Sequence, residues 1–352
     1  MSFSVGIVGL PNVGKSTLFK ALTKIPVDIA AYPFTTIHPN VGVVTVPDER
    51  LLSVAQVIKP EKITPTVIEF IDIAGLVKGA HKGEGLGNQF LAHIRNCDAI
   101  VEVVRAFEDP EVEHVAGPID PERDIEIVKV ELLMKDLETL EGLLSKVGKE
   151  VKSKDNNPPA TRKALKKEEL LKKVKDSVSQ GKLISEINLD DEEKLEIKEY
   201  QFLTQKPILY LLNTDDKIKC LTPGVKHLLG MNLKDEVEMS ELSQTETKEL
   251  GFESQLDQLI LACYNILDLI TFYTVAGGKE TRAWTIIRGG SAPAAGGVVH
   301  SDFEEKFIRA EVISWQKLLE AGNWKEARER GWLKIVGRDY IVQDGDVIEF
   351  RI

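Results

Sequence analysis

The stretch GLPNVGKST at residues 9–17 constrains the fold of this chain more than any other feature. It follows an apolar run of strand length at residues 3–8 and precedes residues 18–22, which predict a helix. A strand, a glycine-bounded loop with the pattern G-x-x-x-x-G-K-[ST] and a helix together indicate a phosphate-binding loop. In such a loop, backbone N–H groups and the helix N-terminus converge on phosphate oxygens.

Each side chain of this loop has an expected role. Lys15 is expected to reach the β- and γ-phosphates of a nucleotide, and the Ser16 hydroxyl is expected to ligate Mg²⁺. The alternative, a chance glycine turn before a helix, is disfavoured because motif, position and flanking elements agree. The predicted nucleotide-binding residues of the loop are Asn12, Val13, Gly14, Lys15, Ser16 and Thr17.

Two later segments are candidates to complete the phosphate site. Residues 25–40 contain three prolines and predict a loop, in which Thr36, or failing that Thr35, could complete the Mg²⁺ shell as a switch residue does. The alternative is a plain solvent loop. The apolar run 67–72 ends at Asp72, which is expected to hold Mg²⁺ through its water shell. The N–H of Gly75, in the pattern D-x-x-G, is then placed to meet the γ-phosphate.

The residue after Gly75 bears on the reaction. Ras-type switches place a glutamine there to orient the attacking water, whereas this chain has Leu76, which cannot hydrogen-bond to water. Either another group performs that task, or hydrolysis is very slow. The glycine-rich residues 78–87 resemble a second switch in composition. A helix at 88–96 and a strand at 98–104 follow, so a mostly parallel α/β sheet is expected.

The base-recognition segment departs from that of GTP-binding folds. The strand at 206–212 ends in Asn213, at the place where those folds carry N-K-x-D, with the acid bonding to guanine. Here Thr214 replaces the lysine whose stem covers the base, while Asp216 stays in register. The choice of base therefore stays open. Residues 237–241 resemble a last strand followed by the loop under the base, which makes Ser240 a further nucleotide-binding candidate.

The middle of the chain predicts a helical insertion. Apolar residues from 130 to 147 recur at spacings of three and four, residues 152–160 break the pattern with two prolines, and a second apolar face follows at 171–178. This predicts an antiparallel coiled-coil hairpin. Its surface is rich in lysine, which fits either a solvated helical face or an arm that contacts a large anionic partner. The lysines are Lys163, Lys166, Lys167, Lys172, Lys173 and Lys175.

From residue 269 the pattern changes to short strands, at 269–275, 281–287 and 306–312, with a glycine-rich turn at 289–297 and a hairpin at 339–350. All four tryptophans lie in this part. Core packing is the favoured use for them, with RNA stacking as the alternative. The predicted domains are 1–125 together with 203–268, the insertion 126–202, and the β-rich domain 269–352.

Composition limits the kinds of partner and the cellular compartment that are expected for this chain. A net charge of −11 and a pI near 5.3 argue against overall attraction to nucleic acid, although a local basic face is compatible with them. The three cysteines, Cys97, Cys220 and Cys263, form no metal or disulfide pattern, which favours a reducing compartment. With no apolar run of about 18 residues and no signal-like start, we expect no membrane association and a cytoplasmic location.

These motifs resemble a known family. The segments 9–17, 32–36, 72–76 and 85–88 resemble the Obg-related P-loop GTPase superfamily of the TRAFAC class. The helical insertion, the altered base motif and the C-terminal part narrow the resemblance to the YchF, or Obg-like ATPase, family. Residues 282–286, 300–304 and 339–347 look like the signature of its TGS domain. The resemblance covers essentially the whole chain.

The resemblance implies an α/β P-loop NTPase fold, a Ras-like G domain with an inserted coiled-coil hairpin and a C-terminal β-grasp TGS domain. It also implies hydrolysis of ATP in preference to GTP, with Mg²⁺, and binding to ribosomes and ribosomal subunits, with rRNA or tRNA as further contacts. His114 falls where a family histidine is thought to replace the missing glutamine, so His114 and Lys15 are the implied catalytic residues. Asp216 departs from the family's usual Glu and keeps a guanine-type acid.

Three functional hypotheses follow. The first is an ATP-hydrolysing conformational switch in translation or stress regulation. The others are a true GTPase ribosome factor and a nucleotide-gated ribosome-binding module whose hydrolysis is incidental. In related P-loop proteins without the glutamine, an asparagine at the position of Asn12 helps to hold K⁺ beside the phosphates, and the alternative here is a plain loop residue.

Overall fold

The computed structural model of the 352-residue chain describes residues 3–25, 40–73, 86–112, 114–115, 117–153, 158–215, 226–242 and 244–352. The chain divides into two compact units. One is formed by Ser4–Ala21 and Ile71–Thr247, and the other by Met1–Phe3, Leu22–Phe70 and Lys248–Ile352. This division places residues 22–70 with the C-terminal part, whereas the predicted domains place them with the P-loop. The predicted domain limits stay a prediction.

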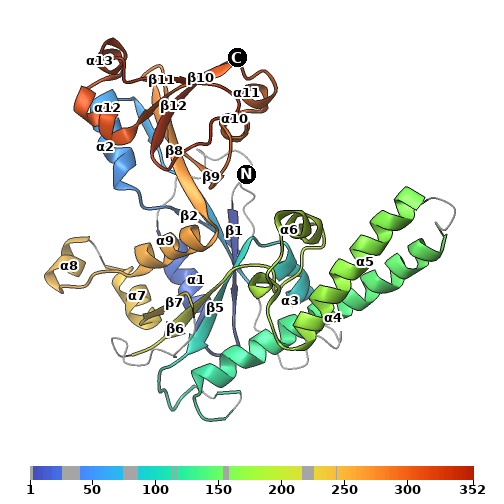
Figure 1. Ribbon diagram of the computed structural model, residues 1–352. Coiled ribbons are helices and arrows are strands. Elements are labelled where there is room, and N and C mark those ends of the chain that lie inside the picture. Colours follow the sequence, from blue (N-terminus) through green and yellow to red (C-terminus); the bar gives the residue numbers. More distant parts are fainter. Residues whose placement is uncertain are drawn as a thin grey trace. The chain divides into compact units, whose positions relative to one another are not determined.

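The unit that carries the P-loop is built on parallel strands (Figure 1). Its strands β1 (Phe3–Val8), β5 (Ala99–Arg105), β6 (Ile208–Asn213) and β7 (Leu228–Met231) pair in that order, each parallel to the next. Strand β5 is buried along its whole length. A strand covered on both faces is made mainly of apolar residues, which explains why the sequence predicts these strands well. Parallel pairing brings their carboxyl ends to one edge, where the P-loop begins.

Among the described residues, four helices belong mainly to this unit outside the insertion. They are α1 (Lys15–Thr23), α3 (Leu86–Arg95), α7 (Leu233–Met239) and α8 (Gln244–Glu249). Helix α7 corrects the sequence analysis, which expected a strand at 237–241. The last strand of this sheet is β7, and Asn232 caps α7 by accepting hydrogen bonds from the N–H groups of Lys234 and Asp235.

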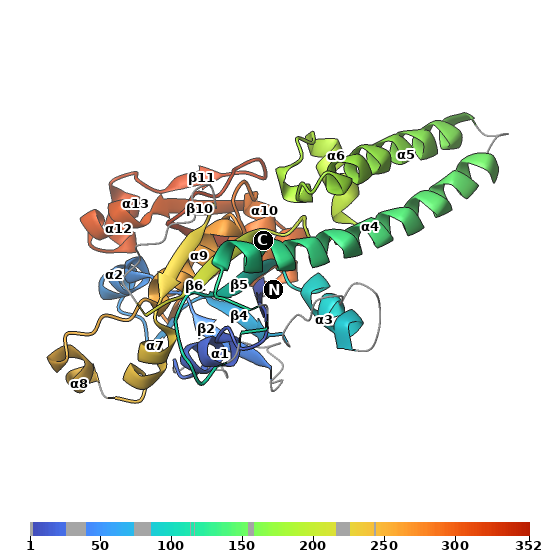
Figure 2. The same cartoon turned by 90° about the horizontal axis from the view of Figure 1, so that it is seen from below.

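The insertion forms the predicted helical hairpin, which we call the arm. Helices α4 (Pro121–Ser153) and α5 (Pro158–Ser179) run antiparallel side by side (Figure 2). The short helix η3 (Ile184–Glu186) and helix α6 (Asp191–Lys198) follow. The arm has a buried apolar seam, made by Leu133, Leu140 and Val147 of α4 and by Leu171, Val174 and Val178 of α5.

One member of the predicted seam lies elsewhere. Val130 is 49% exposed, whereas Val128 and Leu132 beside it are buried. The reason is that the start of α4 packs on the sheet instead of on α5: Ile125 lies in one apolar cluster with Val104 and Leu212. The helix therefore presents a different face at its start than further along.

The other unit contains a mixed sheet with the strand order β11-β10-β12-β8-β9-β3. These strands are β8 (Leu269–Ala276), β9 (Glu280–Ile287), β10 (Arg309–Ser314), β11 (Lys334–Val336), β12 (Asp346–Arg351) and β3 (Lys62–Thr64). Strand β3 comes from the N-terminal third of the chain and pairs in parallel with β9. This unit also contains β2 (Val41–Thr45) and most of β4 (Val67–Asp72), which are neighbours in a sheet.

Helices α2 (Glu49–Ile58), α10 (Ala292–Val299), α11 (Ser301–Glu305), α12 (Trp315–Ala321) and α13 (Trp324–Glu329) pack against this mixed sheet. Helix α9 (Leu256–Ile266) leads directly into β8. Trp315, Trp324 and Trp332 pack against one buried cluster and Trp284 packs against another. Core packing, the favoured reading of the four tryptophans, is therefore confirmed.

Two local predictions in this part are wrong. Residues 339–350 form no hairpin: only β12 is a strand there, and Ile341 makes an isolated antiparallel bridge to Ser291. The cause is Asp346, whose carboxylate accepts hydrogen bonds from the Tyr340 hydroxyl (2.8 Å) and the Gln343 N–H (2.9 Å) and so folds the segment back on itself. The glycine-rich stretch 289–297 begins as a turn but becomes helix α10 from Ala292.

Candidate nucleotide site

The loop between β1 and α1 requires glycine at two places. Gly9 (φ 148°) and Gly14 (φ 89°) have backbone angles that side-chain-bearing residues rarely adopt. A Cβ on Gly9 would collide with the carbonyl oxygen of Val103, and one on Gly14 would collide with the side-chain nitrogen of Asn213. The loop is thus closely packed against the ends of β5 and β6, which gives its backbone a defined shape.

Lys15 opens helix α1, and its ammonium turns back over the loop. The Nζ atom donates a hydrogen bond to the Leu10 carbonyl at 3.2 Å. Burial lowers the pKa of Lys15, while the negative charge of Asp72 acts in the opposite direction. A partly desolvated cation at a helix N-terminus is well suited to an anionic ligand such as a phosphate chain.

Asp72 lies beside Lys15 and Ser16. It ends strand β4, and the next residue, Ile73, donates its N–H to the Ile7 carbonyl at 3.2 Å, which ties this end of β4 to β1. Burial raises the pKa of Asp72, and the charge of Lys15 and a side-chain hydrogen bond with Ser16 oppose that rise. The structure therefore brings together a lysine, a hydroxyl and a carboxylate that the sequence assigned to one site.

These groups fit a magnesium ion. Mg²⁺ in nucleotide enzymes is bound by one or two protein oxygen ligands together with substrate phosphates and water, and Ser16 and Asp72 supply a hydroxyl and a carboxylate. Across the residues that the structure describes, there is no group of three or more His, Cys, Asp or Glu side chains able to hold a metal by themselves. A metal held partly by the phosphates agrees with the presence of these two oxygen ligands and with the absence, among the described residues, of a complete protein metal site.

Asn213 braces the P-loop from the end of β6. Its Nδ2 donates to the Val13 carbonyl at 3.0 Å, and its Oδ1 accepts from the Leu233 N–H at 3.2 Å, both in buried surroundings. The next residue, Thr214, donates its N–H to the Met231 carbonyl at 3.0 Å. The Asn213 side chain thus joins the phosphate loop to the start of α7. It supports the candidate site by bonding to the loop backbone at Val13.

The remaining predicted residues are placed as follows. Thr17 lies in the first turn of α1, half-buried, and Asn12 has a left-handed backbone (φ 63°). Ser240 follows helix α7 instead of a strand, and its Oγ donates to the Val237 carbonyl at 2.6 Å. Thr35, Thr36, Gly75, Leu76 and Asp216 lie outside the described residues.

His114 is buried against an acid that sequence reasoning missed. Its Nε2 lies 2.7 Å from Oδ2 of Asp124, and the two side chains are 5% and 2% exposed. Asp124 stands in the first turn of α4. Acidic residues are common there because they interact favourably with the helix dipole, so nothing in the local sequence marked this one as a histidine partner.

Comparison with known proteins decides the family. Two family models match: one described as "50S ribosome-binding GTPase" over residues 4–136, and the YchF-GTPase C-terminal model, described as a protein of unknown function, over residues 269–352. The "Ribosome-binding ATPase YchF" of Bacillus subtilis is 45% identical over 370 residues, which covers 100% of this chain and 99% of that protein. The chain belongs to the YchF family.

Other YchF proteins agree. The Escherichia coli O157:H7 protein of the same name is 43% identical over 366 residues and is covered over 99% of its length. The solved structure of the Schizosaccharomyces pombe YchF GTPase superposes with a TM-score of 0.86 at 35% identity, over 99% of this chain and 98% of that one. The predicted fold class is thereby confirmed. Among the described residues, no helix has the length and apolar character needed to cross a membrane.

Two more buried charged residues, both on β5, were not predicted from the sequence. Arg105, at the end of β5, is 2% exposed and donates to the carbonyls of Phe107 (3.2 Å), Asp109 (3.2 Å) and Val112 (2.8 Å). Glu102, on the same strand, is 1% exposed, and burial raises its pKa well above the usual range, with Asp124 and Glu126 adding to the rise. The sequence signal that could have revealed these buried charges is the presence of charged residues inside an otherwise apolar strand.

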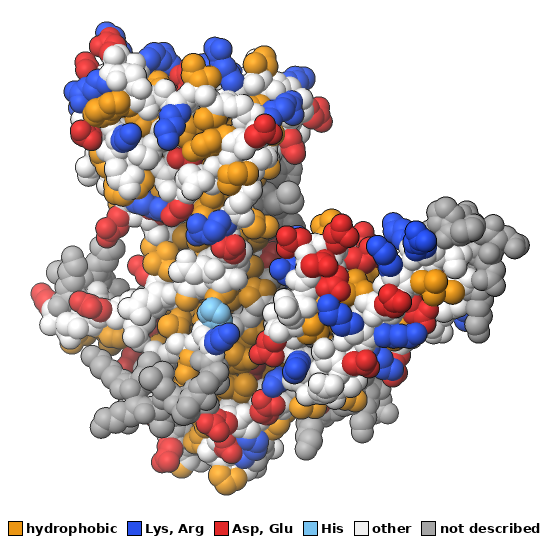
Figure 3. Space-filling model, viewed as in Figure 1, with side chains coloured by type: hydrophobic (Ala, Val, Ile, Leu, Met, Phe, Trp, Pro, Cys, Tyr) orange, Lys and Arg blue, Asp and Glu red, His pale blue; other side chains and the backbone are white. Residues whose placement is uncertain are grey.

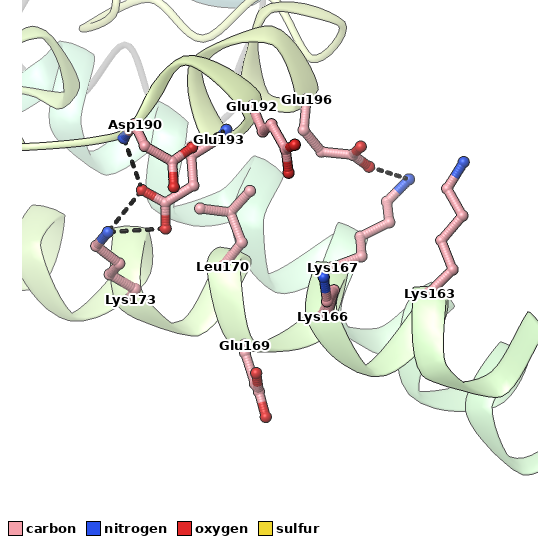
Figure 4. A pocket seen from close by; sticks show the side chains of 10 residues that line it. All are labelled: Lys163, Lys166, Lys167, Glu169, Leu170, Lys173, Asp190, Glu192, Glu193 and Glu196. Atoms are coloured by element: carbon pink, nitrogen blue, oxygen red, sulfur yellow. Dashed lines mark hydrogen bonds and ion pairs between the residues drawn. The ribbon is translucent and has the colours of Figure 1, made fainter. Parts of the chain in front are cut away.

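The lysine-rich arm is less basic than its sequence suggested. Figure 3 shows Lys, Arg, Asp and Glu side chains interleaved over the arm helices. Four of the six lysines are paired with acids: Lys167 with Glu196, Lys172 with Glu168, Lys173 with Glu193 and Lys175 with Glu141. A hollow of about 570 Å³ between α5 and α6 is lined by side chains of both signs (Figure 4).

Proposed function

We propose that this YchF-family protein is a Mg²⁺-dependent nucleoside-triphosphate hydrolase that prefers ATP to GTP. In this proposal it works on the ribosome, in the cytoplasm, as a conformational switch in translation or stress regulation. The observation that carries the proposal is the grouping of Lys15, Ser16 and Asp72 at the end of β1. The curated relatives named "Ribosome-binding ATPase YchF" support ATP and the ribosome. Ribosomal subunits, with their rRNA or a bound tRNA, are the proposed partners of the arm and the C-terminal domain.

The proposed mechanism follows from the loop residues. The backbone N–H groups of residues 12–17 and the Lys15 ammonium bind the phosphate oxygens and stabilise the charge that moves onto them as the bond to the γ-phosphorus breaks. Ser16, Asp72 and Thr36 are the residues that would hold Mg²⁺, which neutralises phosphate charge when it is bound. Gly75 is proposed to donate its N–H to the γ-phosphate.

A water molecule attacks the γ-phosphorus in line with the departing oxygen. Leu76 cannot orient this water, and we assign that task to His114. In the structure the His114 ring is buried against Asp124, so it has to turn away from Asp124 before it can act. That requirement fits a slow basal rate.

The choice of nucleotide is tested by titrating ATP and GTP, each with Mg²⁺, into the wild-type protein and into Asp216→Ala. We expect tighter binding of ATP and an ATP affinity that Asp216→Ala leaves unchanged. The matched control is Asp215→Ala, which removes an exposed acid one residue away. Tighter binding of GTP, weakened specifically by Asp216→Ala, would show a true GTPase and reject the ATP assignment.

A nucleotide-gated ribosome-binding module is the second candidate, because the buried state of His114 is unsuited to turnover. The variant His114→Ala distinguishes the ATP-hydrolysing switch from this binding module. Loss of ATP hydrolysis with preserved nucleotide-dependent ribosome binding supports the nucleotide-gated binding module, whereas hydrolysis at the wild-type rate removes His114 from the mechanism. Comparing hydrolysis in K⁺ and Na⁺ tests the proposed K⁺ beside Asn12, and equal rates would reject that ion.

A further inference from the structure

The segment that carries His114 is anchored at both ends by arginines. At its start, the buried guanidinium of Arg105 donates to three carbonyls between residues 107 and 112 and lies over the Phe107 ring at 4.5 Å. At its end, Arg123 donates to the Pro118 carbonyl at 2.7 Å. Hydrogen bonds of this kind hold the bonded backbone in place, so the described residues on either side of His114 are fixed by arginine side chains.

Asp124 is the group that receives the His114 ring. One carboxylate oxygen lies 2.7 Å from Nε2 of His114, and the other accepts hydrogen bonds from Nε (3.2 Å) and Nη2 (3.0 Å) of Arg123. The carboxylate is 2% exposed, so both interactions are shielded from water. Hydrogen bonds to a charged group are stronger than neutral ones, and removing such a partner from a buried site is costly.

The buried position of the ring conflicts with the task proposed for it. A side chain that positions an attacking water has to reach a water-accessible site, whereas the His114 side chain is 5% exposed and its Nε2 faces a carboxylate. The structure therefore shows the ring withdrawn from solvent. Since Arg123 remains bonded to the other oxygen, Asp124 keeps a cationic partner when the histidine leaves.

We propose that Asp124 is a positioning residue that holds His114 in this withdrawn place and thereby limits basal hydrolysis. The inference rests on the proposed role of His114. Asp124 belongs to the first turn of α4, a continuous helix of 33 residues that is about 50 Å long and forms half of the arm. A displacement of the start of α4 would separate the Asp124 and His114 side chains and release the ring. Binding of a partner to the arm can therefore affect His114 through this single helix.

The test compares Asp124→Ala with Glu126→Gln. Glu126 lies on the same helix and loses one negative charge in its variant, but its side chain is 61% exposed and pairs with Lys129. Two quantities are measured: hydrogen–deuterium exchange at the ring C2 position of His114 by mass spectrometry, and steady-state ATP hydrolysis. For Asp124→Ala we expect faster ring exchange and a kcat raised about tenfold with KM unchanged, the size expected for loss of one hydrogen bond to a charged group. Glu126→Gln should leave both quantities at the wild-type value.

Asp124→Asn is the second variant, because it keeps the side-chain volume if the alanine variant fails to fold. It removes the charge and should raise both ring exchange and kcat, by about threefold for kcat, since a neutral hydrogen bond is weaker than a charge-assisted one. The double variant His114→Ala with Asp124→Ala should return to the rate of His114→Ala alone. A purely structural role for Asp124 predicts no such dependence on His114.

The results that overturn the proposal are specific. A lowered kcat with unchanged ring exchange in the folded Asp124 variants means that Asp124 does not hold the ring back. A raised kcat that persists in the double variant means that the effect does not act through His114. If His114→Ala alone hydrolyses ATP at the wild-type rate, the proposed catalytic role of His114 fails, while ring exchange still decides whether Asp124 holds the ring.

Discussion

Replacing Asn213 with alanine removes one buried side chain that joins the P-loop to the start of helix α7. Two hydrogen bonds are lost, from Nδ2 to the Val13 carbonyl (3.0 Å) and from the Leu233 N–H to Oδ1 (3.2 Å). Alanine offers neither a donor nor an acceptor. The Val13 carbonyl and the Leu233 N–H are left without their partner in a buried place, and Gly14 loses the side chain packed against it.

The size of the effect follows from these two bonds. A buried polar group left without a partner costs about 1–3 kcal/mol, so two of them cost about 2–6 kcal/mol of the free energy of unfolding. Water that enters the space left by the amide can satisfy part of this need. We therefore expect a loss of about 3 kcal/mol. The binding of ATP should weaken by about tenfold or more, because the loop that presents its N–H groups to the phosphates is held less firmly.

Urea unfolding and calorimetric titration with ATP and Mg²⁺ measure the two quantities. Asp215→Ala is the control, because it removes an exposed side chain two residues further along and should change the unfolding free energy by less than about 0.5 kcal/mol. The reasoning is refuted if Asn213→Ala is as stable as the control variant, or if its P-loop binds ATP as tightly as the wild type does.

Two further predictions concern buried charges. Lys15→Met removes a cation whose pKa is lowered by burial, so the free energy of unfolding of the nucleotide-free protein should rise by about 1 kcal/mol, as measured by urea or thermal unfolding. The variant should no longer release phosphate from ATP. A lower unfolding free energy than that of the wild type would contradict this reasoning. Burial raises the pKa of Glu102 far above its usual 4.5, so the native state keeps a proton that the unfolded chain gives up, and wild-type stability should fall as pH rises above about 4.5. Glu102→Gln stays neutral and should flatten that fall, making the variant more stable than wild type at pH about 8 but not at pH about 4 in urea titrations. Parallel pH curves for the two proteins would show that the Glu102 carboxyl does not cause the dependence.

Much of the fold could be predicted because its signals are local. Strands β1, β4 and β6 begin and end within about two residues of the predicted apolar runs, since the buried positions of a strand are filled mainly by apolar residues. The error at residues 237–241 was also local. This segment resembled a last strand, but the cap at Asn232 had already started a helix.

Long-range pairing could not be predicted in the same way. Strand β3 joins β9 more than two hundred residues along the chain, and α2 packs by Leu51 and Val54 into the cluster that holds Trp315. A three-residue strand has no distinctive pattern of its own, and its partner depends on the packing of both segments. The sequence analysis therefore made no prediction about the partners of residues 49–64.

By itself, the sequence determined the residue types of the candidate phosphate site: a glycine-bounded loop, Lys15, Ser16 and an acid at the end of an apolar strand are specified by residue type and spacing. Only the tertiary structure decided what surrounds that chemistry. It placed Asn213 against the Val13 carbonyl, buried Glu102, and set His114 against Asp124. The physical reason is that hydrogen-bond partners and burial depend on strand order and on where α4 starts, and neither of these is a property of any short stretch of sequence.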